Sequence, residues 1–442
     1  MKTLAALTLA LIVGTPALAQ ESRLASDWRR EREKIAEDCD SIAPKGIMSC
    51  AVTLVTAYPF HIALGSLAPN NGFAAGLAFV ERHTPNEDWR ITFNADAVRS
   101  TASAWRAGGY VTFMRTRVEL PGVSTGPAKP PPSSAREYPV FRAYVQHTAL
   151  PHLLDFGPDF ANPQRREFRE AQTILGGSAV MPINRESLRA TALSLSGGAN
   201  GRFVAIDSAA RENWLEVFEE ARARPSLFNG GLKLNYGARL SQFLGGSNGS
   251  SFQRWTLDLR HEIPLYRNVA STGRSEFNGP DECFTGPGAT TCPPVSLSRN
   301  RNGAIGVRLL TVSSSAFDDA GEVPFYFQPT IGGSDINGQR LLPSLEDYRY
   351  RAPHIIAAQI SLEHSIWGPL GAYVSAERGK AAQRRSALDF SGLLTSYSAG
   401  MTLRAGGAPM LTGSWSWGSS GTRLIVTMDA SLLGGGSRPS LF

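Results

Sequence analysis

Apolar and polar side chains alternate along many short segments of this chain. Within residues 89–97, Ile91 and Phe93 point to one face, and Arg90 and Thr92 point to the other. A period of two is typical of a β-sheet whose two faces meet different surroundings. Four further segments alternate in the same way: 232–240, 253–263, 356–363 and 423–432. Ten more segments are candidate strands: 73–82, 106–118, 138–148, 169–181, 187–196, 200–207, 304–313, 370–377, 396–405 and 409–417.

Two all-β architectures produce this pattern. A soluble sandwich or propeller buries the apolar face against a second sheet, whereas a transmembrane barrel turns it to lipid. Several polar faces carry both signs of charge, as a wet lumen allows, and many segments approach the roughly ten residues that a tilted spanning strand needs. Short turns such as Gly406-Gly407 alternate with long connections at 119–137, 267–302 and 315–353. Because short periplasmic turns and long external loops are typical of outer-membrane barrels, the pattern favours a transmembrane antiparallel β-barrel.

The composition agrees with strands that cross a membrane and argues against helices that do so. The 442 residues are 42% hydrophobic, yet no apolar run after residue 19 approaches the roughly 18 residues of a spanning helix. The net charge is +6, from 44 basic and 38 acidic residues. Because the basic excess is spread along the chain, it gives no support to nucleic-acid binding.

The amino-terminal residues predict export. Lys2 precedes an apolar run over residues 4–14, and small residues at 17–19 form a cleavage pattern. The last predicted strand ends near Leu433, so residues 434–442 are expected to form an overhang that ends in Phe442. The predicted organisation is a signal peptide over 1–19, a short periplasmic segment over 20–50 and a barrel over 51–442.

The four cysteines predict two local disulfides. Ten residues separate Cys39 from Cys50, and Cys283 and Cys292 flank a stretch that contains Gly and Pro. Exported proteins meet an oxidising compartment, where such pairs form disulfides. A zinc site would need closer Cys spacing or a nearby His, so we expect no metal site and no cofactor.

A series of motifs between residues 324 and 380 carries a family resemblance. The segments are Pro-Phe-Tyr-Phe-Gln-Pro, Ile-Gly-Gly, Asn-Gly-Gln-Arg and Tyr-Arg-Tyr-Arg, at 324–329, 331–333, 337–340 and 348–351. They are followed by strands that carry Glu363 and Glu377. This order resembles the barrel of the bacterial surface-antigen superfamily, the BamA/TamA-like outer-membrane assembly and secretion factors. The resemblance is clearest over residues 303–433 and implies a barrel of 16 strands.

The resemblance also implies a loop that folds back into the barrel lumen. Arg340 matches the arginine at the loop tip, and Glu363 and Glu377 match acids on the two strands that follow. The glycines of the loop motif are Gly332, Gly333 and Gly338. A bidentate pair between Arg340 and a luminal carboxylate would hold the loop as a plug; the alternative places Arg340 in solvent on an external loop. The chain departs from the family at the tip, where Leu341 and Leu342 replace a Gly-aromatic pair.

The resemblance implies a role in protein assembly or translocation at the bacterial outer membrane. The implied partners are outer-membrane lipid, unfolded outer-membrane or secreted clients, and a separate periplasmic docking protein, because residues 20–50 are too few for the family's docking domains. The alternatives are a passive channel and an outer-membrane hydrolase. We expect no enzyme: the Gly-x-Ser-x-Gly match at 245–249 precedes a predicted strand, whereas a nucleophile elbow precedes a helix.

Overall fold

The computed structural model describes residues 23–40, 50, 53–54, 59–86, 88–115, 138–183, 191–207, 211–245, 251–274, 296–318, 321–367, 370–405, 408–428 and 438–441. The predicted signal peptide, Cys283, Cys292 and Phe442 lie outside these residues. Within the described ranges, no helix combines the length and the apolar character that crossing a membrane requires.

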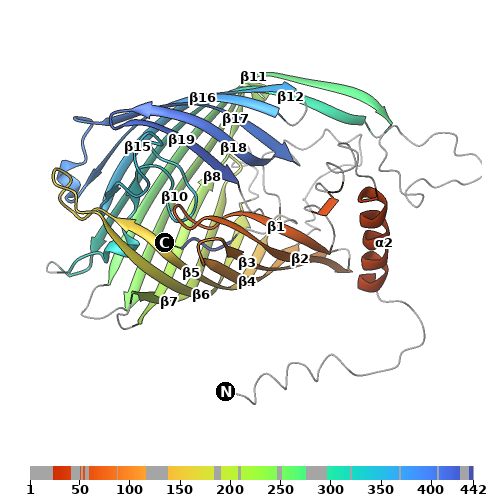
Figure 1. Cartoon of the computed structure of the whole chain (residues 1–442), viewed down its shortest axis with the longest axis horizontal. Coiled ribbons are helices and arrows are strands. Elements are labelled where there is room, and N and C mark those ends of the chain that lie inside the picture. The colour runs from red at the N-terminus through yellow and green to blue at the C-terminus, as the bar shows by residue number, and fades with distance from the viewer. Residues whose placement is uncertain are drawn as a thin grey trace, which may run out of the picture.

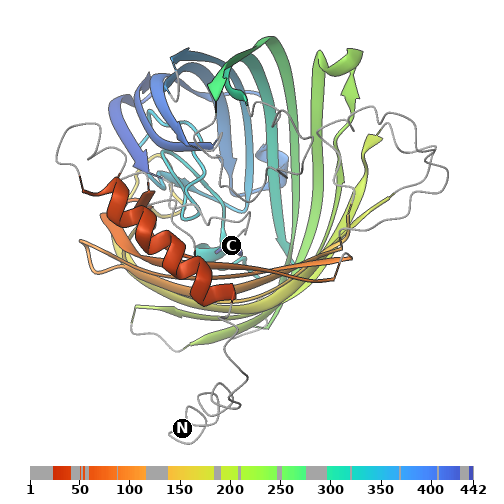
Figure 2. The same cartoon turned by 90° about the vertical axis from the view of Figure 1, so that its right-hand side faces the viewer.

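Sixteen long strands form one antiparallel sheet that wraps into a nearly closed barrel, as Figures 1 and 2 show. The two-residue strand β9 (Ser226–Leu227) also pairs with β10. The sixteen strands are β1 (Phe60–Ser66), β2 (Phe73–Asn86), β3 (Trp89–Ser100), β4 (Trp105–Arg115), β5 (Val140–Asp155), β6 (Arg166–Pro182), β7 (Ser194–Ile206), β8 (Glu212–Ala223), β10 (Leu232–Gly245), β11 (Phe252–Arg274), β12 (Ser296–Ala316), β15 (His354–Trp367), β16 (Leu370–Ala382), β17 (Leu394–Ala405), β18 (Ala408–Gly418) and β19 (Gly421–Met428).

Smaller elements complete the described chain. One helix lies outside the barrel, and a two-stranded sheet lies within the connection between β12 and β15. The remaining elements are single turns of 3₁₀ helix. These elements are α2 (Arg23–Asp38), β13 (Thr330–Ile331), β14 (Tyr350–Arg351), η2 (Phe228–Gly230), η3 (Phe325–Phe327) and η4 (Arg385–Ala387).

The observed strands confirm the predicted antiparallel barrel and correct its details. The alternation predicts fifteen segments, but β7 covers parts of two of them, 187–196 and 200–207. Two strands, β1 and β8, are missing from the prediction. The strand β1 is short, with His61 as the polar residue of its luminal face, and on β8 Glu219 interrupts the apolar outer face. One merged strand and two missed ones convert fifteen segments into sixteen strands.

Alternate side chains of each strand face the lumen and the exterior. On β3, Asn94 and Asp96 are buried on the luminal side, while Phe93, which precedes Asn94, is exposed on the outer side. The outer faces carry a band of exposed apolar residues, which an antiparallel barrel presents to lipid. Members of this band, each on a different strand, are Leu77, Leu175, Leu215, Leu257, Ile360, Val374, Met401, Trp415 and Leu424.

The strands that precede the long connections do not all end at the same end of the barrel. Each strand of the antiparallel ladder runs opposite to its neighbours, so β12 ends at the opposite end of the barrel from β4 and β11. The strands β4 and β11 end where β1 starts. The expectation that the long connections at 119–137, 267–302 and 315–353 share one external end is therefore wrong. Strands β11 and β12 also extend past their neighbours toward α2 (Figure 1).

The helix α2 lies beside the ends of β1 and β2 (Figures 1 and 2). The Trp28 ring meets the Phe60 ring edge-on, with 5.2 Å between their centroids. The structure contains the Cys39–Cys50 disulfide, the first of the two predicted pairs. The Thr53 hydroxyl donates a hydrogen bond to Asp38 at 2.5 Å. The end of α2 is therefore joined to Cys50 by the disulfide and to Thr53 by this hydrogen bond.

The outward face of β6 provides a test of the lipid-facing surface. Leu175 is 58% exposed, and its neighbour Ile174 is fully buried on the luminal side. We expect Leu175→Arg to destabilise the barrel in lipid vesicles by about 2–4 kcal/mol, because a cation in the middle of the lipid face loses its hydration. Urea unfolding followed by tryptophan fluorescence measures this cost. Gln164→Arg, in the exposed connection before β6, is the control. Equal midpoints for the two variants would contradict a lipid-facing β6.

Candidate functional site

The connection between β12 and β15 folds into the barrel, as the predicted luminal loop requires. Phe327 in this loop is 1% exposed and packs against rings of three wall strands. Its centroid lies 5.4 Å from Trp214, 5.1 Å from Phe243 and 5.5 Å from Phe252. The guanidinium of Arg254, on the luminal side of β11, donates to the Phe327 carbonyl. An aromatic cluster with a central cation therefore fixes the first half of the loop.

The Gly-Gly pair allows a tight fold in the middle of the loop. Gly332 and Gly333 both adopt positive φ angles, +122° and +57°. A Cβ atom on Gly332 would lie 2.4 Å from the Glu346 carbonyl oxygen, and one on Gly333 would lie 1.9 Å from the Asp347 carboxylate. Only glycine fits both the backbone angles and these contacts. Gly338 also has a positive φ of +78°, in the turn at the loop tip.

Asp347 connects this fold to the last strand of the barrel. Its carboxylate accepts a hydrogen bond from the backbone amide of Ser334 at 2.9 Å. It also forms a bidentate pair with Arg423 of β19, at 2.8 and 3.4 Å. Arg423 donates in addition to the Leu345 carbonyl. Bidentate, charge-assisted pairs are strong and directional, so Arg423 holds the loop from the barrel wall.

Glu377 of β16 provides a second attachment of the loop. Its buried carboxylate accepts hydrogen bonds from the backbone amide of Leu342 at 2.7 Å and from the Gln359 side chain at 2.8 Å. The next strand, β17, contributes the Ser396 hydroxyl, which accepts from the Ser344 amide at 2.9 Å. The loop tip is therefore bound through its backbone to β16 and β17.

The three residues predicted to anchor the loop, Arg340, Glu363 and Glu377, do not form one cluster. Arg340 pairs with neither predicted acid; its guanidinium donates to the Tyr373 hydroxyl at 3.4 Å. Glu377 meets the loop through the Leu342 amide. Glu363 lies exposed toward the other end of β15, opposite Tyr373 in the sheet. Arg340 and Leu342 of the loop therefore both contact β16, through Tyr373 and Glu377 respectively. The charged pair that attaches the loop to the wall is Asp347 with Arg423.

Two buried tyrosines of the loop remain neutral. Burial raises the pKa of Tyr348 well above its ordinary value, and nearby acids act in the same direction. Burial also raises the pKa of Tyr326, whose hydroxyl donates to Glu212 at 2.6 Å. A neutral phenol requires less hydration than a phenolate, so both rings contribute to loop packing.

Buried ion pairs line the luminal wall, and one group of them adjoins the aromatic cluster around Phe327, since Arg202 lies 5.9 Å from the Phe243 centroid. Glu216 of β8 is 1% exposed and meets Arg202 at 2.6 Å and Arg239 at 2.7 Å. On β3 and β4, Asp96 meets Arg106 at 3.0 Å. The lumen is therefore lined by both signs of charge, as the ionic polar faces predict. The described residues contain no cluster of three or more His, Cys, Asp or Glu side chains arranged to hold a metal ion.

The first and last strands form a seam in the barrel wall. Each of the other neighbouring strands shares a hydrogen-bonded ladder, whereas among the described residues β1 pairs with β2 alone and β19 with β18 alone. On the outer face of β19, Leu424 and Val426 are 69% and 63% exposed. A cavity of about 1180 Å³ lies between β19, the β1–β2 turn and the loop tip, where Arg340, Asp347 and Arg423 line it.

Sequence reasoning missed the pairing of Asp347 with Arg423. Arg423 lies on the polar side of the alternating segment 423–432, which is the available signal of a luminal cation. Nothing in the alternation assigns it a partner 76 positions away. Such pairings are set by where the loop folds and not by local sequence.

Neither a protein-family model nor a curated protein sequence matches this chain. Solved structures with similar barrels include CdiB from Acinetobacter baumannii, at 10% identity and a TM-score of 0.47, and CdiB from Escherichia coli, at 10% and 0.47. BamA from Haemophilus ducreyi, in a form lacking POTRA domains 1–3, is similar at 8% identity and a TM-score of 0.49. Each comparison covers 84% of this chain. The chain spans 59%, 62% and 69% of those three chains, respectively.

The loop attachments differ in what they contribute to loop order. We expect Arg423→Ala to accelerate amide hydrogen exchange over residues 330–350, because losing a charge-assisted pair costs about 1–3 kcal/mol of local stability. Arg340→Ala removes one long hydrogen bond and serves as the matched control, with little change expected. Exchange measured by mass spectrometry on the purified barrel separates the two. A larger effect from Arg340→Ala would assign the anchor to Arg340.

Proposed function

We propose that this chain is a bacterial outer-membrane barrel that assists the insertion or translocation of other proteins, acting at the seam between β1 and β19. The observation that carries the proposal is a pair of strand edges, on β1 and β19, that share no ladder within the part of the chain that the structure describes. Backbone amides and carbonyls at such edges form hydrogen bonds with an added strand. In lipid this tendency is strong, because the hydrocarbon offers no other hydrogen-bond partner.

The chemistry of the seam suits an unfolded barrel client. An incoming strand would pair its backbone with β19 or β1, so recognition depends little on side chains. The exposed apolar face of β19, with Leu424 and Val426, matches the lipid-facing side of such a strand. The proposed partners are therefore membrane lipid and unfolded outer-membrane or secreted proteins, delivered by a separate periplasmic docking protein. The proposed role involves no enzymatic chemistry and no cofactor.

The sequence resemblance to the surface-antigen superfamily supports the same role. The quoted motifs correspond to the luminal loop and to β15 and β16, the region that contacts the seam through Asp347 and Arg423. A passive channel needs no open seam, because a fully laddered wall is the more stable barrel. The seam is thus the feature that separates these two functions.

Reconstitution in lipid vesicles tests this role. We expect the purified barrel to accelerate the folding of a small urea-unfolded β-barrel client, measured by heat-modifiable migration on a gel, relative to empty vesicles. A disulfide cross-link between β1 and β19 should abolish the acceleration, because a client strand then finds no free edge. Cysteines at the outward positions Ile62 or Leu64 of β1, each combined with Val426→Cys, provide candidate cross-links.

The matched control carries a cross-link at a laddered boundary. Ala97 of β3 and Ala107 of β4 are register partners, so cysteines there lock two strands that are already paired. This variant should keep full activity after the same oxidation. Client folding at the rate of empty vesicles, together with steady ion conductance, would favour the passive channel instead.

A further inference from the structure

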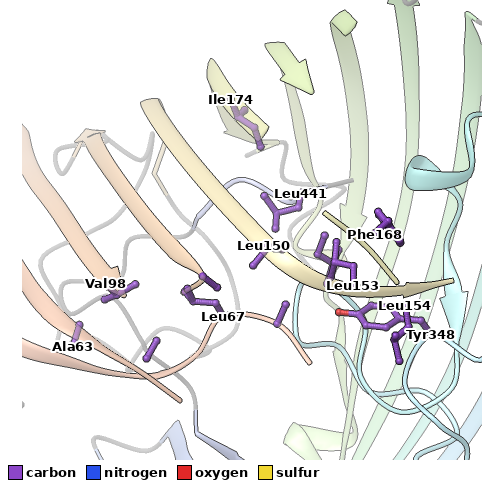
Figure 3. Close-up of a cluster of buried hydrophobic side chains, with 14 of the residues drawn as sticks. Ala63, Leu67, Val98, Leu150, Leu153, Leu154, Phe168, Ile174, Tyr348 and Leu441 are labelled. Carbon is purple, nitrogen blue, oxygen red and sulfur yellow. The ribbon is translucent and has the colours of Figure 1, made fainter. Parts of the chain in front are cut away.

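The carboxy-terminal residues of the chain lie inside the barrel. Residues 438–441 contact the luminal wall and the luminal loop, far from the overhang that the sequence predicts for residues 434–442. That expectation is therefore wrong for residues 438–441. Figure 3 shows Leu441 among buried side chains of the wall, near Leu150 and Ile174.

The wall provides a carboxylate for the Arg438 side chain. Asp96 of β3 is 4% exposed, and its Oδ2 atom lies 3.1 Å from the Arg438 guanidinium. Arg106 of β4 meets the same oxygen at 3.0 Å from the other side. The acid therefore remains partnered by Arg106 when the tail leaves, so the site can be vacated without an isolated buried charge.

The backbone and the last apolar side chain of the tail are also recognised. Arg202 of β7 donates to the Ser440 carbonyl at 3.0 Å. The Leu441 amide donates to the side-chain oxygen of Asn337, in the luminal loop, at 2.8 Å. The Leu441 side chain is 8% exposed and belongs to a cluster with Leu150, Ile174 and Ile336. Charge, backbone and apolar contacts thus converge on four consecutive residues.

We propose that the luminal wall contains a peptide-binding site that the chain's own tail occupies as a displaceable latch. The ligand class is a short peptide with an arginine three positions before a leucine, as in Arg438-Pro439-Ser440-Leu441. The tail bridges β3, β7 and the luminal loop, and it lines the same cavity as β19. Its departure frees the lumen beside the seam. This inference concerns the state of the lumen and does not depend on which client, if any, the barrel inserts.

Peptide binding to a tail-less barrel tests the site. The probe is a fluorescent synthetic peptide of residues 438–442, and the protein is the detergent-solubilised barrel that ends at Ser437. We expect anisotropy to report saturable binding to this truncated barrel and none to the full-length barrel, whose site is filled. A peptide with glutamate in place of arginine should bind about 10- to 100-fold more weakly, because a charge-assisted hydrogen bond contributes that much affinity.

A full-length variant keeps the test decisive if truncation prevents folding. Arg438→Glu places a second acid beside Asp96, so the tail should leave the site and the wild-type peptide should bind in its place. Arg384→Glu, the same substitution on an exposed residue of another connection, should bind no peptide. Planar-bilayer conductance should rise severalfold for Arg438→Glu, and the peptide should reverse the rise.

Two results would overturn the proposal. The first is a folded truncated or Arg438→Glu barrel, judged by heat-modifiable migration, that binds no peptide. The second is equal peptide binding by the wild-type and Arg438→Glu barrels, since the tail would then not occupy the site. If Arg438→Glu binds the peptide as expected but its conductance is unchanged, the peptide-binding site stands and the claim that the tail acts as a latch is wrong.

Discussion

A strand in the hydrocarbon core of a membrane must find hydrogen-bond partners along both edges, because lipid offers none to its amides and carbonyls. Fifteen ladders meet this demand for the sixteen strands, and the boundary between β1 and β19 is where the described residues share no ladder. The cost of unpaired backbone is therefore concentrated at one place in the wall. The luminal loop contacts the inner side of this boundary, where Asp347 pairs with Arg423 of β19.

Charge and aromatic packing are combined in the lumen, since Arg202 pairs with Glu216 and also lies over the Phe243 ring. Arg254 lies among the rings around Phe327, whereas Glu216 and Asp96 each meet arginines on neighbouring strands. Buried charges are tolerated only when they are paired and hydrogen-bonded. These pairs join neighbouring strands of the wall. Arg254 also donates to the loop, and Arg202 and Asp96 also bind the tail.

Much of the fold can be predicted from the sequence, but few of the ion pairs and hydrogen bonds inside the lumen can. The period of two identifies most strands because lipid and water act on alternate residues along the whole chain. It fails for β8, where Glu219 lies on the outer face and blurs the contrast, and for β1, which is short. The family motif predicts that a loop enters the lumen, and the Gly332-Gly333 geometry explains why glycine is needed there. Pairings such as Asp347 with Arg423, or Arg438 with Asp96, join distant segments without periodicity, so only the folded chain reveals them.

Arg423 belongs to β19, whose described residues pair with β18 alone, and it is at the same time the main charged partner of the loop. The position of β19 and the position of the loop are therefore two parts of one equilibrium. Thermodynamic linkage requires that the coupling between them be reciprocal. A molecule that binds the free edge of β19 and draws Arg423 away weakens the hold on the loop, and a molecule that draws the loop out of the lumen loosens β19 by the same factor. The contact between Arg423 and Asp347 thus links the position of the last strand in the barrel wall to the position of the luminal loop.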